Sequence, residues 1–283
     1  MACSTPFTFG IALVPRAAAG NWSLIEALLD LALKSVLAQT DQDFQVVIAG
    51  HDRPCTALDG DPRLTFLAAD WPVHDTGPHN DDSGRKKHAL NDFVQDRGGG
   101  LFMLLDADDW VDARLVEAAR ATIGPDEVGA LIDSGFVTDF QALYAAPLPH
   151  PRVFPGEFHR LCGSSTVALL RPEEEDPLRR DPFSVLRSHH RWVEAARERG
   201  AGLARLPVSG NYLINTSENH SEVHGPHLEW RRAFTAAVKR EGRPLDEALA
   251  ARFGLGLGRV HAAARRFFPG AGAESWGSTS GGS

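Results

Sequence analysis

The chain has 283 residues, of which 43% are apolar and 23% are charged, and it carries a formal net charge of −8. This length and balance predict a globular protein with a full hydrophobic core, built as one large α/β domain or two smaller ones. The negative net charge and the lack of a long basic stripe in the sequence argue against a nucleic-acid-binding protein held by phosphate contacts.

The cysteines and the apolar segments bear on the compartment. Cys3, Cys55 and Cys162 are scattered and odd in number, which favours a reducing compartment and no structural zinc site. The amino terminus shows no charged segment followed by a long apolar one, and no stretch reaches the roughly 18 apolar residues of a membrane span. We therefore expect a soluble, cytoplasmic protein.

The amino-terminal part of the chain alternates apolar strands with amphipathic helices. Apolar runs predict strands at residues 7–14, 44–50 and 64–67 and in the run that starts at Gly100, and helical spacing predicts helices at 23–37 and 86–95. This β-α-β-β-α-β order predicts a mostly parallel, doubly wound central sheet flanked by helices. Ligands bind such sheets at the carboxyl ends of the strands.

The apolar run that starts at Gly100 ends abruptly on Asp106, Asp108 and Asp109. It predicts a buried strand that presents carboxylates at its carboxyl end. Oxygen ligands of this kind suit Mg²⁺ or Mn²⁺, which usually share their remaining positions with substrate phosphates. The alternative is an acidic turn that leads into a helix, with Asp109 or Asp112 as the N-cap.

Six segments of the chain, taken together and in order, carry a family resemblance. They are residues 35–48, 84–91, 106–109, 162–171, 189–200 and 211–221. They resemble the first helix and second strand, the basic segment, the Asp-x-Asp motif, the acceptor-side strand, the late helix and the closing strand with its metal loop of family 2 glycosyltransferases. The resemblance covers roughly residues 7 to 225, which is more specific than any single motif.

Members of that family have the GT-A fold, so the resemblance implies a GT-A, Rossmann-like sheet and a metal-dependent hexosyltransferase that uses a nucleotide-diphosphate sugar, with a UDP-sugar favoured. It implies Asp108 as the direct metal ligand, Asp106 facing the ribose or the metal through water, and His220 as a further ligand of Mn²⁺ or Mg²⁺. The alternative for His220 is a loop histidine that caps a turn. The acceptor, whether glycan, lipid-linked or protein, is not specified.

The resemblance also implies a set of donor contacts, from Pro15, Asp52, Lys86, Lys87, Asn91 and Asp106. Lys86 and Lys87 stand near a predicted helix start, where backbone N–H groups also favour anions, and a solvated charge run is the alternative. The second strand ends in His51 and Asp52 instead of the family's usual acidic pair. Either residue is a candidate for recognising the nucleotide base.

His189 and His190 stand where inverting members of the family carry an aspartate as general base. Histidine can do this work because its pKa lies near working pH, and we expect His190 or His189 to be the base. Glu194 and Asp181 are alternative bases.

Three other functions compete with sugar transfer. A non-catalytic nucleotide-sugar-binding module would keep the fold without a base. A metal-dependent phosphatase would use the strand-end aspartate, but its downstream acidic pair is not evident. A nucleotidyltransferase would need a glycine-rich phosphate loop near the first strand, for which residues 14–20 are a poor candidate.

Beyond the resemblance, residues 226–269 predict a helical extension and residues 270–283 a flexible Gly/Ser-rich tail. Within residues 1–225 we expect a nucleotide-binding part at about 1–125 and an acceptor part at about 126–225. The extension is expected to pack back on the domain or to form a homo-oligomer surface. Peripheral contact with an anionic membrane is the alternative, through the following residues: Arg259, Arg265, Arg266, Phe267 and Phe268.

Overall fold

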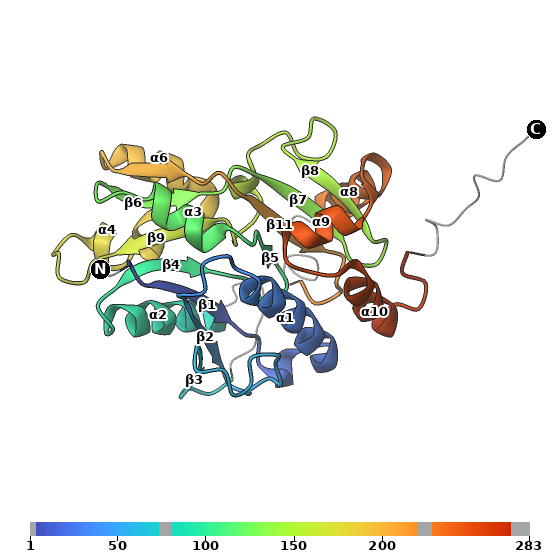
Figure 1. Cartoon of the computed structure of the whole chain (residues 1–283), viewed down its shortest axis with the longest axis horizontal. Coiled ribbons are helices and arrows are strands. Elements are labelled where there is room, and N and C mark those ends of the chain that lie inside the picture. The colour runs from blue at the N-terminus through green and yellow to red at the C-terminus, as the bar shows by residue number, and fades with distance from the viewer. Residues whose placement is uncertain (1–3, 74–80, 220–227, 273–283) are drawn as a thin grey trace, which may run out of the picture.

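The computed structural model describes residues 4–73, 81–219 and 228–272, which form two β-sheets with helices packed around them (Figure 1). Among these residues the main sheet has seven strands, in the order β10-β6-β9-β4-β1-β2-β3. Strand β9 is antiparallel to both of its neighbours, and the other neighbouring pairs are parallel. The expected α/β fold with a mostly parallel central sheet is confirmed. The strands are β1 (Phe7–Ala12), β2 (Gln45–Gly50), β3 (Leu64–Ala68), β4 (Gly100–Leu104), β6 (Glu127–Leu131), β9 (Thr166–Leu170) and β10 (Gly202–Arg205).

Helices cover both faces of the main sheet. On one face Phe9 and Ile11 of β1 share a core with α1 (Trp22–Leu37) and α3 (Leu115–Thr122). On the other face lies α2 (Asp81–Gln95), and there β1 carries Gly10. A methyl group at Gly10 would lie 2.6 Å from the ring of Phe102 on the neighbouring strand β4 and 3.4 Å from Leu90 of α2, so the Phe102 ring occupies its place beneath α2 because Gly10 has no side chain.

The helix ends differ from the sequence-based expectation in two places. Helix α2 begins at Asp81, ahead of the predicted start at Lys86. Helix α3 has Arg114 as its N-cap, so the alternative that made Asp109 or Asp112 the N-cap is wrong. Asp109 is buried among other partners, and Asp112 instead accepts a hydrogen bond from the backbone N–H of Arg114 (3.0 Å).

A second sheet, in the order β12-β8-β7-β11-β5, stands beside the first. Strands β7 and β11 are parallel and the other pairs are antiparallel. Strand β5 follows the acidic turn directly and pairs with β11. The acidic turn is therefore held between β4 of the main sheet and β5 of the second sheet. The strands are β5 (Trp110–Val111), β7 (Ser134–Asp139), β8 (Tyr144–Leu148), β11 (Ser209–Ile214) and β12 (Arg243–Pro244).

The carboxyl-terminal helices pack back on the domain. Helices α8 (Leu228–Glu241), α9 (Glu247–Arg252) and α10 (Leu257–Phe267) lie over the second sheet and against α1. Phe268, which was a candidate for membrane contact, packs edge-on against the ring of Phe140. In the part of the chain that the structure describes, no helix is long and apolar enough to cross a membrane.

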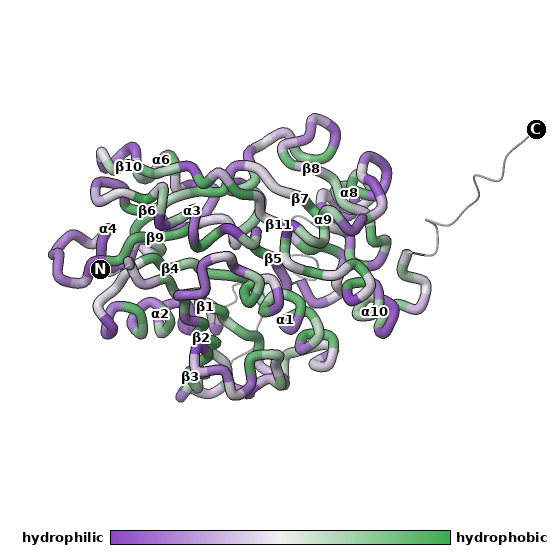
Figure 2. Tube along the Cα trace, viewed as in Figure 1, coloured by the Kyte–Doolittle hydropathy of each residue, from purple (hydrophilic) through white to green (hydrophobic). Residues whose placement is uncertain are grey.

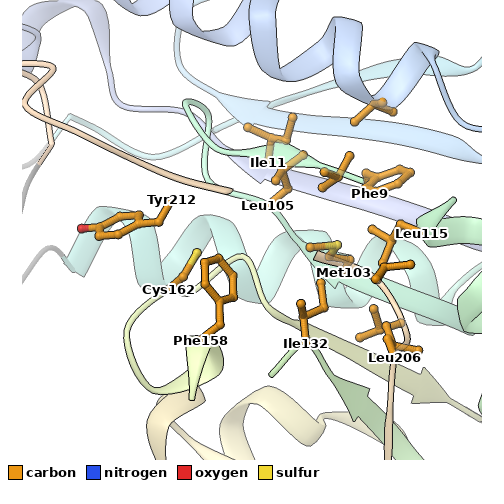
Figure 3. Packing of buried hydrophobic residues seen from close by; sticks show 14 of the residues in the cluster. Phe9, Ile11, Met103, Leu105, Leu115, Ile132, Phe158, Cys162, Leu206 and Tyr212 are labelled. Atoms are coloured by element: carbon orange, nitrogen blue, oxygen red, sulfur yellow. The ribbon is translucent and has the colours of Figure 1, made fainter. Parts of the chain in front are cut away.

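The main core joins the two sheets. Apolar residues, green in Figure 2, gather in central strands such as β1, β4 and β9. Phe9 and Met103 of the main sheet belong to the same cluster as Tyr212 of β11. Figure 3 shows Phe158 and Cys162 between Tyr212 and Met103. The loops that carry Phe158 and Cys162 are therefore anchored in the core just below the acidic turn.

Candidate active site

Three carboxylates lie within the five residues that follow β4, and the fold gives each a different environment. Asp106 is exposed, Asp108 is half-buried and Asp109 is fully buried. Their spacing in the sequence does not show which of them reach solvent, and in the structure only the first two do. We therefore treat Asp106 and Asp108 as ligand-facing and Asp109 as part of the framework.

Asp109 ties three segments together beneath the acidic turn. One carboxylate oxygen accepts a hydrogen bond from the N–H of Leu213 (2.9 Å), and the other accepts from Ser164 Oγ (2.7 Å) and Cys162 Sγ (3.3 Å). Burial, and secondly the charge of Asp106, raise the pKa of Asp109 to about 7. The hydrogen bonds to Asp109 therefore only partly offset the cost of burying its charge.

Asp106 is positioned by the loop that precedes β9. Its backbone N–H donates to Ser164 Oγ (2.9 Å), and that hydroxyl in turn donates to Asp109. Its carboxylate lies beside Gly163, where a methyl group would be only 3.2 Å from Oδ2. The absence of a side chain at Gly163 thus leaves room for the carboxylate at the mouth of the site.

Asp108 is held from the other side by the loop that follows β11. Asn219 Nδ2 donates to Asp108 Oδ2 (2.7 Å) and to the carbonyl of Leu213 (3.1 Å). Two residues of this loop, Asn215 (φ 59°) and Ser217 (φ 68°), have left-handed backbone, and such outliers concentrate at functional sites. His220, the expected third metal ligand, lies outside the described residues.

The acidic turn fits a hard divalent cation. Asp106 and Asp108 offer carboxylate oxygens, the ligand type that Mg²⁺ and Mn²⁺ prefer. The charge of Asp106 is the second cause, after burial, of the raised pKa of Asp109, so the carboxylates of this turn repel one another, and a cation would offset that repulsion. The residues present are thus consistent with the expected metal, whose identity the fold does not specify.

A cleft of about 360 Å³ opens beside Asp106. Its walls come from the start of α2, the end of β4, the loop before β9 and the segment before α6 (Trp192–Glu198). Expected or alternative site residues on these walls are Lys87, Asp106, Asp181 and His189.

His189 begins a 3₁₀ turn, η3 (His189–Arg191), and its ring enters the cleft. Its Nδ1 is hydrogen-bonded to the carbonyl oxygen of His159. A carbonyl can only accept, so Nδ1 carries the proton and Nε2 has the free lone pair. The Cδ2 atom next to Nε2 would lie 3.9 Å from a methyl group at Gly163, so this edge of the ring and the Asp106 carboxylate border the same glycine. Burial lowers the pKa of His189 from its ordinary value, which favours the neutral ring.

His190 has a different environment, although it is adjacent in sequence. It is exposed, and its Nδ1 is paired with the hydroxyl of Ser188 (2.8 Å). The two rings are perpendicular, with centroids 5.6 Å apart. Of the two, His189 is the one that lines the cleft.

The alternative bases are engaged elsewhere. Glu194 forms an ion pair with Arg160 (2.7 Å), and this contact lowers the pKa of Glu194. Asp181 reaches the cleft wall but accepts from the N–H of Ser184 (3.0 Å), where it caps α5 (Pro182–Leu186).

Two expected donor contacts meet at the ends of β1 and β2. Pro15 is buried and precedes the 3₁₀ turn η1 (Arg16–Ala18), and Asp52 accepts from the first N–H of that turn, that of Arg16 (2.8 Å). The two residues are thereby brought together. Asp52 is half-buried and remains accessible at this edge of the sheet.

The basic segment divides into a buried and an exposed part. Lys86 is only 1% exposed, donates to the carbonyl of Leu13 (2.7 Å) and forms an ion pair with Asp82. Lys87 is exposed and lines the cleft. Asn91 is buried and donates to the carbonyl of Arg180 (3.1 Å). The fold thus assigns Lys86 and Asn91 to internal contacts and presents Lys87 to solvent.

A second group of potential metal ligands was not anticipated from the sequence. Asp133, Glu157 and His159 bring three ligand atoms within 4.8 Å of one another. Arg205 already contacts the Asp133 carboxylate (2.6 Å), so the protein itself supplies a cation at this cluster. No spacing in the sequence signals the cluster, because its members come from two separate loops.

Comparisons with known proteins add little to this geometry. No family model matches the chain, and no curated protein matches it. Among solved structures, a protein from Desulfovibrio desulfuricans G20 designated a nucleotide-diphospho-sugar transferase is 13% identical with a TM-score of 0.37, covering 84% of this chain and 99% of its own. An active-site mutant of LgtC is 13% identical with a TM-score of 0.34, covering 68% and 64%. WbbM, a bifunctional glycosyltransferase, is 10% identical with a TM-score of 0.37, covering 93% and 52%. At these values the similarities carry no functional argument. The argument for function rests on the geometry of the site.

Proposed function

We propose that the protein is an inverting glycosyltransferase that moves a sugar from a nucleotide-diphosphate sugar to a hydroxyl group of an acceptor, with His189 as general base. One observation carries this proposal. The exposed carboxylate of Asp106 and the unprotonated edge of His189 border the same small residue, Gly163, in one cleft. A single displacement at a sugar carbon requires two groups that face one cleft. One is a carboxylate that can bind a diphosphate-bound metal, and the other is a neutral base.

The proposed reaction has one step. His189 Nε2 takes the proton of the acceptor hydroxyl, and the oxygen forms a bond to the anomeric carbon of the donor. The bond from that carbon to the diphosphate oxygen breaks, and the nucleoside diphosphate leaves with both electrons. The proton on His189 Nδ1 stays hydrogen-bonded to the carbonyl of His159 throughout, so the ring remains oriented while it takes up charge.

Asp106 and Asp108 would hold the divalent cation, which offsets the charge that develops on the departing diphosphate. Lys87 stands on the wall of the same cleft and would add a positive charge near the leaving group. Lys86 would act indirectly, because its buried ammonium group holds the end of β1 through the carbonyl of Leu13.

For the donor base we propose uracil, recognised at the ends of β1 and β2. Asp52 has carboxylate lone pairs beyond the one used by the N–H of Arg16, and an N–H of the base can donate to them. Pro15 beside it is buried, so it would shape this end of the site and not present a surface to the base.

The rival functions predict different chemistry at the same carboxylates. A phosphatase needs an aspartate that attacks phosphorus and has no need of a neutral histidine at the cleft wall. A binding module needs the carboxylates but no base. The orientation of His189, with its lone pair on the Gly163 side, favours transfer over both.

A panel assay separates the three functions. The purified protein is incubated with UDP-, GDP- and ADP-sugars and with p-nitrophenyl phosphate, each with Mn²⁺ and with a chelator. We expect nucleoside diphosphate release from a UDP-sugar, only with Mn²⁺, and no p-nitrophenol. Hydrolysis of p-nitrophenyl phosphate alone would indicate a phosphatase. Tight donor binding without turnover on any acceptor would indicate a binding module.

A further inference from the structure

The carbonyl that orients His189 belongs to a short turn with an unusual anchor. The 3₁₀ turn η2 (Phe158–Arg160) begins where the N–H of Phe158 donates to the backbone carbonyl of Asp133 (2.8 Å). The side chain of His159 is fully buried, and its Nδ1 lies 2.9 Å from the Asp133 carboxylate. Asp133 thus holds the turn twice, once through its backbone and once through its side chain.

The charges around the His159 ring define its hydrogen bond. Arg205 contacts the same Asp133 oxygen (2.6 Å), and Glu157 lies 3.7 Å from His159 Nε2. Beside a guanidinium group, Asp133 is a carboxylate that only accepts, so His159 Nδ1 donates to it. The ring of His159 therefore has one orientation in the turn.

His159 consequently links Asp133 to His189. The side chain of His159 is fixed by Asp133, while its backbone carbonyl accepts from Nδ1 of His189. The ring and the carbonyl belong to one residue of a hydrogen-bonded turn, so holding the buried ring limits how far the peptide that carries the carbonyl can rotate. Arg160, the next residue, joins the same turn to α6 through Glu194 (2.7 Å).

We propose that Asp133 and His159 are positioning residues that keep the proton of the general base His189 on Nδ1 and its lone pair toward the cleft. The inference rests on the proposed function and extends it to residues outside the cleft. Neither residue touches substrate in this account. They act on the base through one backbone carbonyl.

This arrangement differs physically from a carboxylate bonded directly to the base. A direct carboxylate would stabilise the protonated ring and favour a charged histidine before the reaction. A carbonyl is neutral, so it selects the tautomer without adding a charge next to His189. The carboxylate of Asp133 contacts His159 and not His189. There it orients the carbonyl through the His159 side chain, and its negative charge is paired with Arg205.

The test measures the tautomer itself. Nitrogen-15 NMR of the imidazole rings distinguishes an Nδ1–H histidine from an Nε2–H one, and the His189→Gln spectrum assigns the signal. Asp133→Ala removes the side-chain contact but leaves the backbone bond to Phe158. His159→Leu removes the same hydrogen bond from the other partner, and His159→Asn retains a side-chain N–H that can donate to Asp133. Arg160→Ala changes the same turn without touching the Asp133 contact and serves as the matched control.

We expect His189 to be in the Nδ1–H form in wild type, Arg160→Ala and His159→Asn, and to become a mixture of tautomers in Asp133→Ala and His159→Leu. In those two variants kcat should fall about 10-fold with donor KM unchanged, the size of effect seen when groups that orient a histidine are lost. An Nδ1–H signal retained in both would overturn the proposal, and so would lost kcat with an unchanged tautomer. If wild type transfers no sugar, the proposed function fails, while the NMR result still decides whether Asp133 and His159 position the ring.

Discussion

The gap at Gly163 offers a sharp test of the site geometry. A methyl group there would lie 3.2 Å from Asp106 Oδ2 and 3.9 Å from His189 Cδ2. Ordinary carbon contacts lie at about 3.5–4.0 Å, so the carboxylate must move by a few tenths of an ångström while the histidine need not. Because a misplacement of about 1 Å costs roughly 10²-fold in rate, we expect Gly163→Ala to lower kcat about 10-fold.

The same substitution should leave the fold intact. Gly163 does not have a left-handed backbone, so alanine there is not strained. The expected change in the free energy of unfolding is within about 1 kcal/mol. Gly84→Ala is the matched control, since Gly84 lines the same cleft but an added methyl group would meet no atom within 4 Å. Steady-state kinetics and urea unfolding measure both quantities. Equal kcat for Gly163→Ala and Gly84→Ala would refute the reasoning.

Three further predictions follow from other parts of the site. Asp108→Ala should weaken UDP binding at least ~10-fold, or ~1.4 kcal/mol, in titrations with Mn²⁺, and equal affinities with and without the metal would contradict the metal assignment. Breaking the buried pair with Asp82 by Lys86→Ala should cost about 3–5 kcal/mol in urea unfolding, whereas Lys87→Ala should change stability by less than about 0.5 kcal/mol, and similar losses would contradict their different burial. Because burial lowers the pKa of His189, kcat/KM of the free enzyme should stay constant on acidification to about pH 6.5 and fall only below it, and a fall that begins well above pH 6.5 would argue against this base.

Much of the main sheet could be predicted from periodicity. The strands expected at residues 7–14, 44–50 and 64–67 appear as β1, β2 and β3. Short apolar runs bounded by polar turns favour buried strands. The second sheet could not be predicted in the same way. Strands β7 and β8 mix polar residues, glycine and proline with apolar ones, and they form a sheet because β11 pairs with β7 from far along the chain.

The site was predictable in composition but not in detail. The acidic turn was expected, yet the burial of Asp109 depends on Ser164 and Leu213, which are distant in sequence. The sequence likewise gave no means of choosing between His189 and His190. That choice depends on which ring meets the carbonyl of His159, and a backbone acceptor leaves no residue-type signal.

The most direct test of the central claim compares His189→Ala with His190→Ala. Sugar transfer from a UDP-sugar is followed by NMR, which also reports the configuration of the product, and donor affinity is measured by calorimetry. The account predicts that His189→Ala loses about 10²–10⁴ in rate with donor affinity within about threefold, and that His190→Ala transfers normally with inversion. Normal transfer by His189→Ala would contradict the account, and the base would have to be sought at Asp181 or Glu194.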